Sequence, residues 1–342
     1  MEIITEARKP HPNGKDIFVF TLQNSMGTKV KITNYGAIIM AIKLRKSDGT
    51  YNDIVLGFDE PSDYWSAEYL KNYPYYGAAV GRVGNRIAPD YFTIDGEKYV
   101  LNTDRDGYQL HGGVEGFDKK VWDVVSKDDD KLVLQYVSPD GEEGYPGKLT
   151  VKIVFSLSDD NELSYEYFAE TDKPTIVNMT HHSYFNLNDG QRDIHDTFIR
   201  LASSQYLEQD ENFCVTGKVL PVAGTRNDFS QFRTTGSIPN PENGIDISFP
   251  LDKQGIEKMA AEAYSGNTKL EIFTTAPLVH LYNASGSPSI TGKGGRQYKP
   301  FYGFCIETQI HPNAINIPSF PNVVLRPGET YHTKTVYKFT QK

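Results

Sequence analysis

The sequence predicts an all-β fold, and three observations lead to that class. Most apolar runs are short, alternate with polar residues and are rich in Val, Ile, Tyr, Phe and Thr, which is the pattern of half-buried strands. Turn-forming pairs such as Asp48-Gly49 and Asp95-Gly96 separate these runs. Helical periodicity is rare. Many strands separated by turns favour a sandwich or a barrel over alternating β and α units, and the pattern alone leaves both open.

The clearest strands share this alternation and are expected, in chain order, over residues 17–21, 28–33, 37–44, 131–137, 149–157, 162–168, 269–274 and 331–339. A hairpin is expected around Asp95-Gly96, because this pair joins two β-rich runs at residues 91–94 and 98–101. Together these elements are enough for a large β-structure.

Three other segments have a different pattern. Residues 61–70 and 255–264 are expected to be short helices. Residues 217–250 contain many Gly, Pro and Asn and are expected to form a loop that covers something, because long ordered loops in a compact β fold are often functional. We expect one domain over residues 1–342, since no linker, low-complexity tract or repeat divides the chain.

The charge and the cysteines limit the partners and the compartment. A net charge of −9 argues against nucleic acid or an anionic membrane as a partner and suits a neutral small molecule. The first ten residues lack an apolar leader, and no segment reaches the length of a membrane span, so a cytoplasmic protein is expected. Cys214 and Cys305 have no metal-ligand spacing and are expected to be buried free thiols.

The most informative segment is the decapeptide at residues 178–187, which reads NMTHHSYFNL. As an extended segment, it places His182 and Tyr184 on one face and His181 on the other. The two neighbouring histidines therefore cannot hold one metal ion together. An imidazole on a polar face can give and take a proton near neutral pH. The alternative is that His182 is a core histidine bonded to backbone.

Two further motifs combine glycine with donor side chains. Residues 81–87 read GRVGNRI, where glycine allows close approach of the backbone and Arg82 or Arg86 can bind oxygen atoms. A phosphate loop is disfavoured because the Gly-Lys-Ser/Thr ending is missing. A structural ion pair is the alternative for one of the arginines. Residues 110–113 read LHGG, which places His111 before two glycines in a loop.

Two carboxylates are candidates for the same site. Glu307 lies near the end of an apolar strand-like run at residues 303–309, where an ionised carboxylate needs a partner. It is a candidate base, and a strand end that reaches solvent is the alternative. Asp246 closes the loop sequence NGID and can accept hydrogen bonds from hydroxyls. The chain has no Gly-x-Ser-x-Gly, His-Glu-x-x-His, dinucleotide or EF-hand signature.

Taken together, these motifs resemble the galactose mutarotase (aldose 1-epimerase) family in the family's order. They are NYGA at 34–37, GRVGNRI at 81–87, LHGG at 110–113, GYPG at 144–147, the decapeptide, NGID at 243–246, ETQ at 307–309 and LRPG at 325–328. The resemblance implies a large antiparallel β-sandwich, or supersandwich, with a sugar cleft. It also implies interconversion of the α and β anomers of an aldose without a cofactor or a metal.

The resemblance assigns roles to individual residues. It implies that Glu307 is the base at the C1 hydroxyl and that His182 is the acid at the ring oxygen. Arg82 is then the structural arginine. The residues expected to bind the sugar are Asn85, Arg86, His111, Tyr184, Asp246 and His280.

Departures from the family pattern affect the expected substrate. His280 stands where many members have Gln, Ile247-Ser248 follow Asp246, NAS occupies residues 283–285, and Asn313 replaces a frequent Asp. We expect all of these to lie away from the acid and base. They leave glucose, galactose and maltose as candidate sugars, with a maltose-preferring epimerase as one alternative.

Other function classes remain as competitors. A silent sugar-binding sandwich would not need both Glu307 and His182. A glycoside hydrolase or lyase would need a carboxylate pair such as Asp246 with Glu307. A sugar-phosphate epimerase would need a basic pocket, for which Arg86 and Lys293 are the candidates. We expect a monomer or a homodimer.

Overall fold

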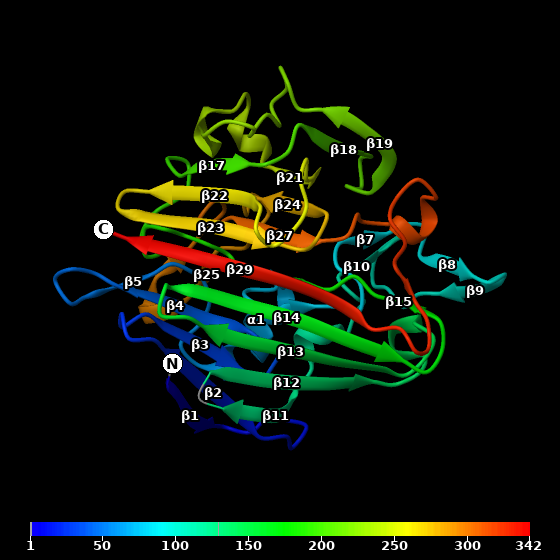
Figure 1. Cartoon of the computed structure of the whole chain (residues 1–342), viewed down its shortest axis with the longest axis horizontal. Helices are drawn as coiled ribbons and strands as arrows, with labels where there is room; N and C mark the ends of the chain where they lie inside the picture. The colour runs from blue at the N-terminus through cyan, green and yellow to red at the C-terminus, as the bar shows by residue number, and fades with distance from the viewer. Residues whose placement is uncertain (1, 129) are drawn as a thin grey trace.

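The largest sheet has nine strands and forms the front layer in Figure 1. The computed structural model describes residues 2–128 and 130–342. In spatial order the strands are β11 (Asp123–Asp128), β12 (Lys131–Ser138), β13 (Leu149–Leu157), β14 (Glu162–Thr171), β29 (Tyr331–Gln341), β23 (Thr268–Thr274), β22 (Met259–Ser265), β17 (Phe198–Leu201) and β20 (Arg233–Thr234). The C-terminal strand β29 lies between β14 and β23, so the last strand of the chain joins the two halves of the sheet.

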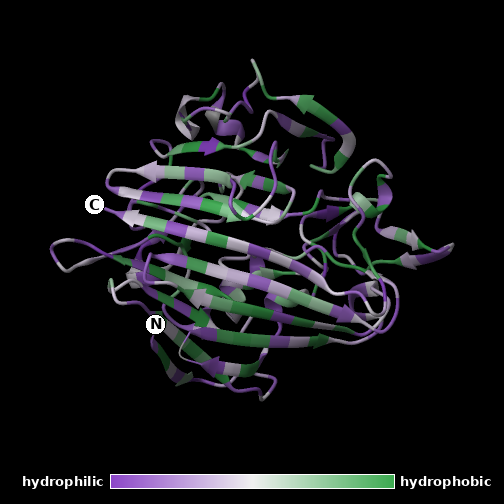
Figure 2. Cartoon of the chain, viewed as in Figure 1, coloured by the Kyte–Doolittle hydropathy of each residue, from purple (hydrophilic) through white to green (hydrophobic). Residues whose placement is uncertain are grey.

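A second sheet is formed by the first five strands in chain order. They are β1 (Glu2–Arg8), β2 (Ile17–Gln23), β3 (Lys29–Thr33), β4 (Ile39–Arg45) and β5 (Tyr51–Asp53). Ile32 and Ile42 from this sheet share one buried core with Ile153 and Leu270 from the nine-stranded sheet. Figure 2 shows polar and apolar residues alternating along the front strands, as expected when one face of a sheet is buried. The chain is therefore an all-β protein with large antiparallel sheets, as the sequence predicts.

The remaining elements are short. A three-stranded sheet contains β21 (Asp246–Pro250), β24 (Leu278–Tyr282) and β27 (Cys305–Gln309). Two-stranded pairs are β6 (Ala79–Val80) with β16 (Thr180–His181), β7 (Arg86–Ile87) with β10 (Gln109–Leu110), β8 (Tyr91–Ile94) with β9 (Glu97–Val100), β15 (Thr175–Ile176) with β28 (Val324–Leu325), β18 (Gln205–Gln209) with β19 (Val215–Pro221), and β25 (Ile290–Thr291) with β26 (Gln297–Tyr298).

The helical elements are few and short. They are the α-helix α1 (Ala67–Lys71) and the 3-10 helices η1 (Pro61–Trp65), η2 (Phe117–Lys119), η3 (Glu142–Gly144), η4 (Thr235–Ser237), η5 (Pro241–Asn243), η6 (Lys293–Gly295) and η7 (Ala314–Asn316). Among the residues that the structure describes, none of these helices has the length and apolar character needed to cross a lipid bilayer. Both cysteines are buried and free, as predicted.

Most of the expected elements are confirmed, and two are corrected. The strands and the hairpin at Asp95-Gly96 are present, and the helix expected at residues 61–70 is present as the 3-10 helix η1 followed by the short α-helix α1. The helix predicted at residues 255–264 is wrong, because most of this segment lies in β22, which pairs with β17 and β23. Its alanines favour a helix locally, but pairing on both sides satisfies the backbone of a strand instead. The loop predicted at 217–250 is also only partly correct, because β19 and β21 occupy its two ends.

His181 is a buried core histidine. Its Nε2 lies 3.3 Å from the carbonyl oxygen of Ala37 and its Nδ1 lies 3.2 Å from the hydroxyl of Ser183. The rings of Phe155 and Tyr165 flank the imidazole. Burial lowers the pKa of His181 to about 3, because the charged form is poorly solvated there. Of the two neighbouring histidines, His181 is thus a core residue bonded to backbone.

This burial makes the stability of the protein depend on pH. Between pH 6.5 and 3 the unfolded chain binds a proton at His181 that the native protein excludes, so the free energy of unfolding decreases as the pH falls below 6.5. The decrease that His181 contributes to the free energy of unfolding approaches about 1.4 kcal/mol per pH unit. Urea denaturation of the wild type and of His181→Gln at pH 7, 6 and 5 would measure it. We expect a shallower pH dependence for the variant, and equal slopes would contradict the burial argument.

Candidate active site

Three polar side chains lie in a row across the small sheet of β21, β24 and β27. Ser248 is opposite His280, and His280 is opposite Glu307. Directly opposite residues of antiparallel strands project from the same face, so the row faces one side. Asp246 is two residues before Ser248 and projects from that face as well. Strand pairing alone therefore gathers two carboxylates, a histidine and a hydroxyl.

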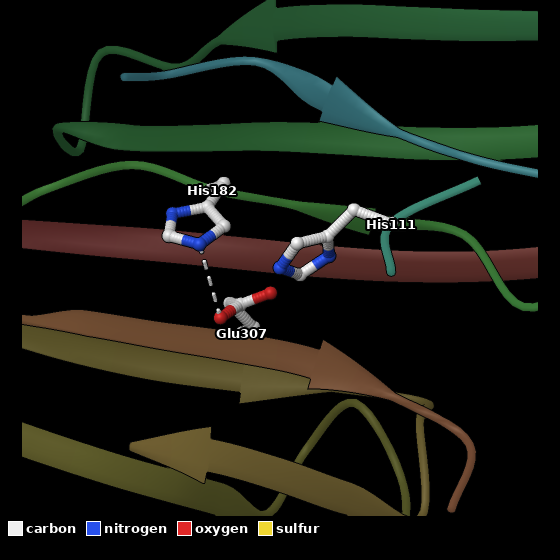
Figure 3. A group of neighbouring side chains, drawn as sticks. All are labelled: His111, His182 and Glu307. Carbon is white, nitrogen blue, oxygen red and sulfur yellow. Dashed lines mark ion pairs between the residues drawn. The ribbon is translucent and has the colours of Figure 1, made fainter. Parts of the chain in front are cut away.

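The decapeptide brings His182 to Glu307. Its Phe185 forms a bridge with Phe304, the residue before β27, which aligns the two segments. The Nε2 atom of His182 lies 3.5 Å from Oε1 of Glu307 (Figure 3). Both side chains are almost completely buried, with Glu307 only 1% exposed. The second carboxylate oxygen, Oε2, has no hydrogen-bond partner within the described part of the chain.

Packing rather than strong hydrogen bonding orients the His182 ring. It lies nearly parallel to the rings of Tyr75 and Tyr184, with centroid distances of 5.8 and 5.0 Å. Its Nδ1 lies 3.4 Å from the sulfur of Cys305. Burial raises the pKa of the Cys305 thiol well above its ordinary value, so the sulfur is a neutral, weak partner.

His111 reaches the same place from the turn after β10. The N–H of Asn85 donates to Nδ1 of His111 at 3.1 Å. Burial lowers the pKa of His111 well below its ordinary value, and the positive charges that His182 and Arg86 can carry act in the same direction. His111 is therefore a neutral imidazole whose Nδ1 accepts and whose Nε2 carries the proton. It can donate one hydrogen bond through Nε2.

The ligand atoms of His111, His182 and Glu307 lie within 4.8 Å of one another (Figure 3). Two histidines and a glutamate can hold zinc in enzymes. The opposite directions of His181 and His182 exclude one shared metal ion for that pair, but they do not bear on a site that contains His111. A metal ion at Nε2 of His111 would require the proton to move to Nδ1, which would break the bond from Asn85. That hydrogen bond favours a donor role for His111.

Asp246 is held in its ionised form by its neighbours. Nε2 of His280 donates to Oδ1 of Asp246 at 2.7 Å, and the guanidinium of Arg86 lies 3.6 Å from Oδ2. Burial acts to raise the pKa of Asp246, but the hydrogen bond from His280 and the positive charge of Arg86 outweigh it, so the pKa is lowered. Asp246 is thus an acceptor of hydrogen bonds at the side of the cleft.

The side chains of His280 and Asn85 are engaged by other protein groups. Nδ1 of His280 accepts from the hydroxyl of Ser248 at 2.9 Å and lies 3.3 Å from the amide nitrogen of Asn85. Both nitrogens of His280 are therefore engaged, and its imidazole orients Asp246. The expectation that the departures from the family pattern lie away from the acid and base is wrong for His280, which is directly opposite Glu307.

All eight predicted site residues surround one cavity of 460 Å³. They are His182, Glu307, Asn85, Arg86, His111, Tyr184, Asp246 and His280. Arg82, expected to be structural, is 2% exposed and donates to Ser138 and to the carbonyls of Pro146 and Gly147. The irregular segment after β19 covers part of the cavity, as expected, through Arg226, Asn243 and neighbouring residues.

Sequence reasoning missed several residues of the cavity wall. Tyr75, Arg105, Phe213 and Tyr282 all line it. The only local sequence pattern that could have indicated one of these residues is the tyrosine-rich run at residues 73–76 around Pro74. The other three residues come from segments without a motif, and only the tertiary structure brings them to the cleft.

Comparison with known proteins agrees with this geometry. The family model for Aldose 1-epimerase matches residues 19–338. A galactose mutarotase from Rattus norvegicus is 40% identical over 319 residues, which is 91% of each chain, and an aldose 1-epimerase from Escherichia coli is 34% identical over 96% of each. The crystal structure of a galactose 1-epimerase from Lactobacillus acidophilus has a TM-score of 0.85 at 28% identity, covering 100% of this chain and 99% of that one.

The position of His111 depends on Gly112. Gly112 has φ +86°, and a Cβ there would overlap the carbonyl oxygen of Gly81. We expect Gly112→Ala to reduce the free energy of unfolding by about 2–4 kcal/mol and to reduce activity, because the turn must move away from Gly81. Gly107→Ala is the matched control, since Gly107 has φ +78° and open space around it.

The two variants are compared by thermal denaturation and by an activity assay. The control should lose only about 1 kcal/mol, the cost of a left-handed backbone with a side chain, and should keep its activity. Equal stability of the two variants would show that the close approach to Gly81 is unimportant.

Proposed function

Because the chain belongs to the aldose 1-epimerase family and is a mutarotase, we propose that Glu307 and His182 are the base and acid that open and close the sugar ring. One observation carries this proposal. The carboxylate and the imidazole lie 3.5 Å apart in a buried cleft, and one carboxylate oxygen lacks a hydrogen-bond partner within the described residues. A sugar hydroxyl can supply that missing donor.

The two groups are sufficient for the reaction. Glu307 takes the proton of the C1 hydroxyl while His182 gives a proton to the ring oxygen. The bond between C1 and the ring oxygen breaks, and the open form carries an aldehyde at C1. After rotation about the C1–C2 bond, the freed hydroxyl attacks the other face of the aldehyde. His182 takes back its proton and Glu307 returns its own to the new C1 hydroxyl, so no atom or electron is gained or lost.

The other predicted residues have distinct roles in this proposal. Neutral His111 donates a hydrogen bond to a sugar oxygen near the reacting end. Arg86 and ionised Asp246 bind hydroxyls as donor and acceptor, and their opposite charges partly compensate each other in the cleft. Asn85 and His280 position these groups, and Tyr184 forms the wall against which His182 stacks.

The competing functions receive less support. Asp246 is held ionised, which does not suit the proton donor of a glycoside hydrolase. Lys293, the second basic candidate for a phosphate site, is instead bound by Asp53 at 2.8 Å and by the carbonyl of Met40 at 2.9 Å. A silent binding protein would have no use for the contact between His182 and Glu307.

The substrate is an aldose, and glucose, galactose and maltose are the sugars to compare. A single domain over residues 1–342, the cytoplasm as compartment, and a monomer or homodimer stay predictions. The two free cysteines support the cytoplasmic assignment. Gel filtration with light scattering addresses the oligomeric state.

The acid and base assignments are tested by Glu307→Gln and His182→Asn. Each variant should lower the rate of mutarotation by about 10²-fold or more, because each removes one proton-transfer group and leaves the cleft shape. Polarimetry of fresh α-D-glucose, α-D-galactose and maltose in weak buffer at neutral pH measures the rate, and circular dichroism checks folding.

A second histidine–glutamate pair provides the control. His332 and Glu166 lie 3.1 Å apart on the exposed side of β29 and β14. We expect Glu166→Gln and His332→Asn to keep wild-type rates. Full activity of either active-site variant would show that the assignment is wrong.

A further inference from the structure

Phe213 is a large apolar side chain that the fold leaves exposed at the mouth of the cleft. It lies in the turn between β18 and β19, is 49% exposed and lines the same cavity as Glu307. The turn is well defined, because the carboxylate of Asp210 accepts from the N–H groups of Asn212 and Cys214. Phe213 has φ +61°, an uncommon conformation for a bulky residue. The turn therefore holds the ring at the mouth rather than in the core.

The contacts of Phe213 place it outside the hydroxyl-binding groups. Its ring lies over the guanidinium of Arg86 at 5.3 Å, and Arg86 in turn lies 3.6 Å from Asp246. Glu307 is 1% exposed, whereas Arg86 and Asp246 have side chains 12% and 22% exposed. Exposure thus increases from Glu307 through Arg86 and Asp246 to Phe213, which is the direction from the floor of the cleft to its mouth.

This direction identifies the part of a sugar that would reach Phe213. In the proposed function the C1 end of the ring lies at Glu307 and His182. C4 is on the opposite side of a pyranose ring from C1, so a group attached to O4 points toward the mouth. A 4-linked reducing disaccharide keeps its C1 hydroxyl free and carries a second ring at this position. The apolar C–H face of that ring can pack on an aromatic side chain.

The cavity also has room and polar groups for a second ring. Its volume of 460 Å³ lies in the range for ligands larger than a single hexose. Gln209 and Arg226 line it, and the nitrogen Nε2 of Gln209 and Nε of Arg226 are buried without hydrogen-bond partners among residues 2–128 and 130–342. Sugar hydroxyls are suitable acceptors for these donors.

We propose that Phe213, with Gln209 and Arg226, forms an outer subsite for the second ring of a 4-linked reducing disaccharide. The proposal rests on the proposed function, because it uses the position of C1 at Glu307 and His182. It makes Phe213 a determinant of substrate specificity that takes no part in proton transfer.

The test compares kcat and KM for glucose and maltose, by polarimetry, in the wild type and Phe213→Ala. We expect the variant to raise KM for maltose about three- to tenfold, with kcat for both sugars and KM for glucose unchanged. Phe213→Trp should keep the wild-type KM for maltose. Isomaltose, whose second ring is attached at O6, should show no effect of Phe213→Ala.

Phe232 is the matched control, because it is 41% exposed, its ring lies over Arg200 at 5.4 Å, and it does not line the cavity. Phe232→Ala should leave KM for maltose unchanged. If Phe213→Ala changes KM for glucose as much as for maltose, or changes neither, the outer subsite is overturned while the mutarotase function stands. If the wild type accelerates no sugar, the proposed function is overturned and the subsite with it.

Discussion

The burial of Glu307 beside His182 is the constraint on which the rest of the site depends. A carboxylate with little exposure is costly unless it is paired and hydrogen-bonded. One oxygen faces the imidazole at 3.5 Å, and the other has no partner in the described chain. The surrounding sheets must therefore hold a group that is not fully satisfied. Such an oxygen is the natural place for a sugar hydroxyl, since binding supplies the hydrogen bond that the protein leaves out.

Surroundings, rather than residue type, decide what each histidine can do. His181 and His182 are neighbours, yet His181 is a neutral core residue and His182 faces the proposed base. The pair of His332 and Glu166 is closer, at 3.1 Å, than the pair in the cleft. The side chains of His332 and Glu166 are 45% and 24% exposed, so water screens the pair and the shorter distance gives it no comparable chemical role. Burial therefore distinguishes the two pairs.

The sequence contained most of the fold and the central residues of the site, for physical reasons. Strands such as β13 and β14 can be predicted because one face is buried, which makes apolar and polar residues alternate along them. Glu307 and His182 can be predicted because they lie in short motifs. The helix predicted at residues 255–264 is wrong because its alanines favour a helix locally, whereas pairing with β17 and β23 makes most of the segment a strand. His280 was misplaced because its position opposite Glu307 follows from strand register, which local sequence does not show.

The same register separates the proposed proton-transfer groups from the proposed outer subsite. Glu307 and His280 project from the inner strands, whose pairing is hard to alter without shifting the whole row. Phe213 and Gln209 belong to the β18–β19 hairpin, and Arg226 follows in the irregular segment, so these residues can change with little effect on the inner strands. Asp246 connects the two regions, since one oxygen is held by His280 and the other faces Arg86. A cleft built in this way can keep the same proton-transfer reaction while the residues at its mouth change to fit different sugars.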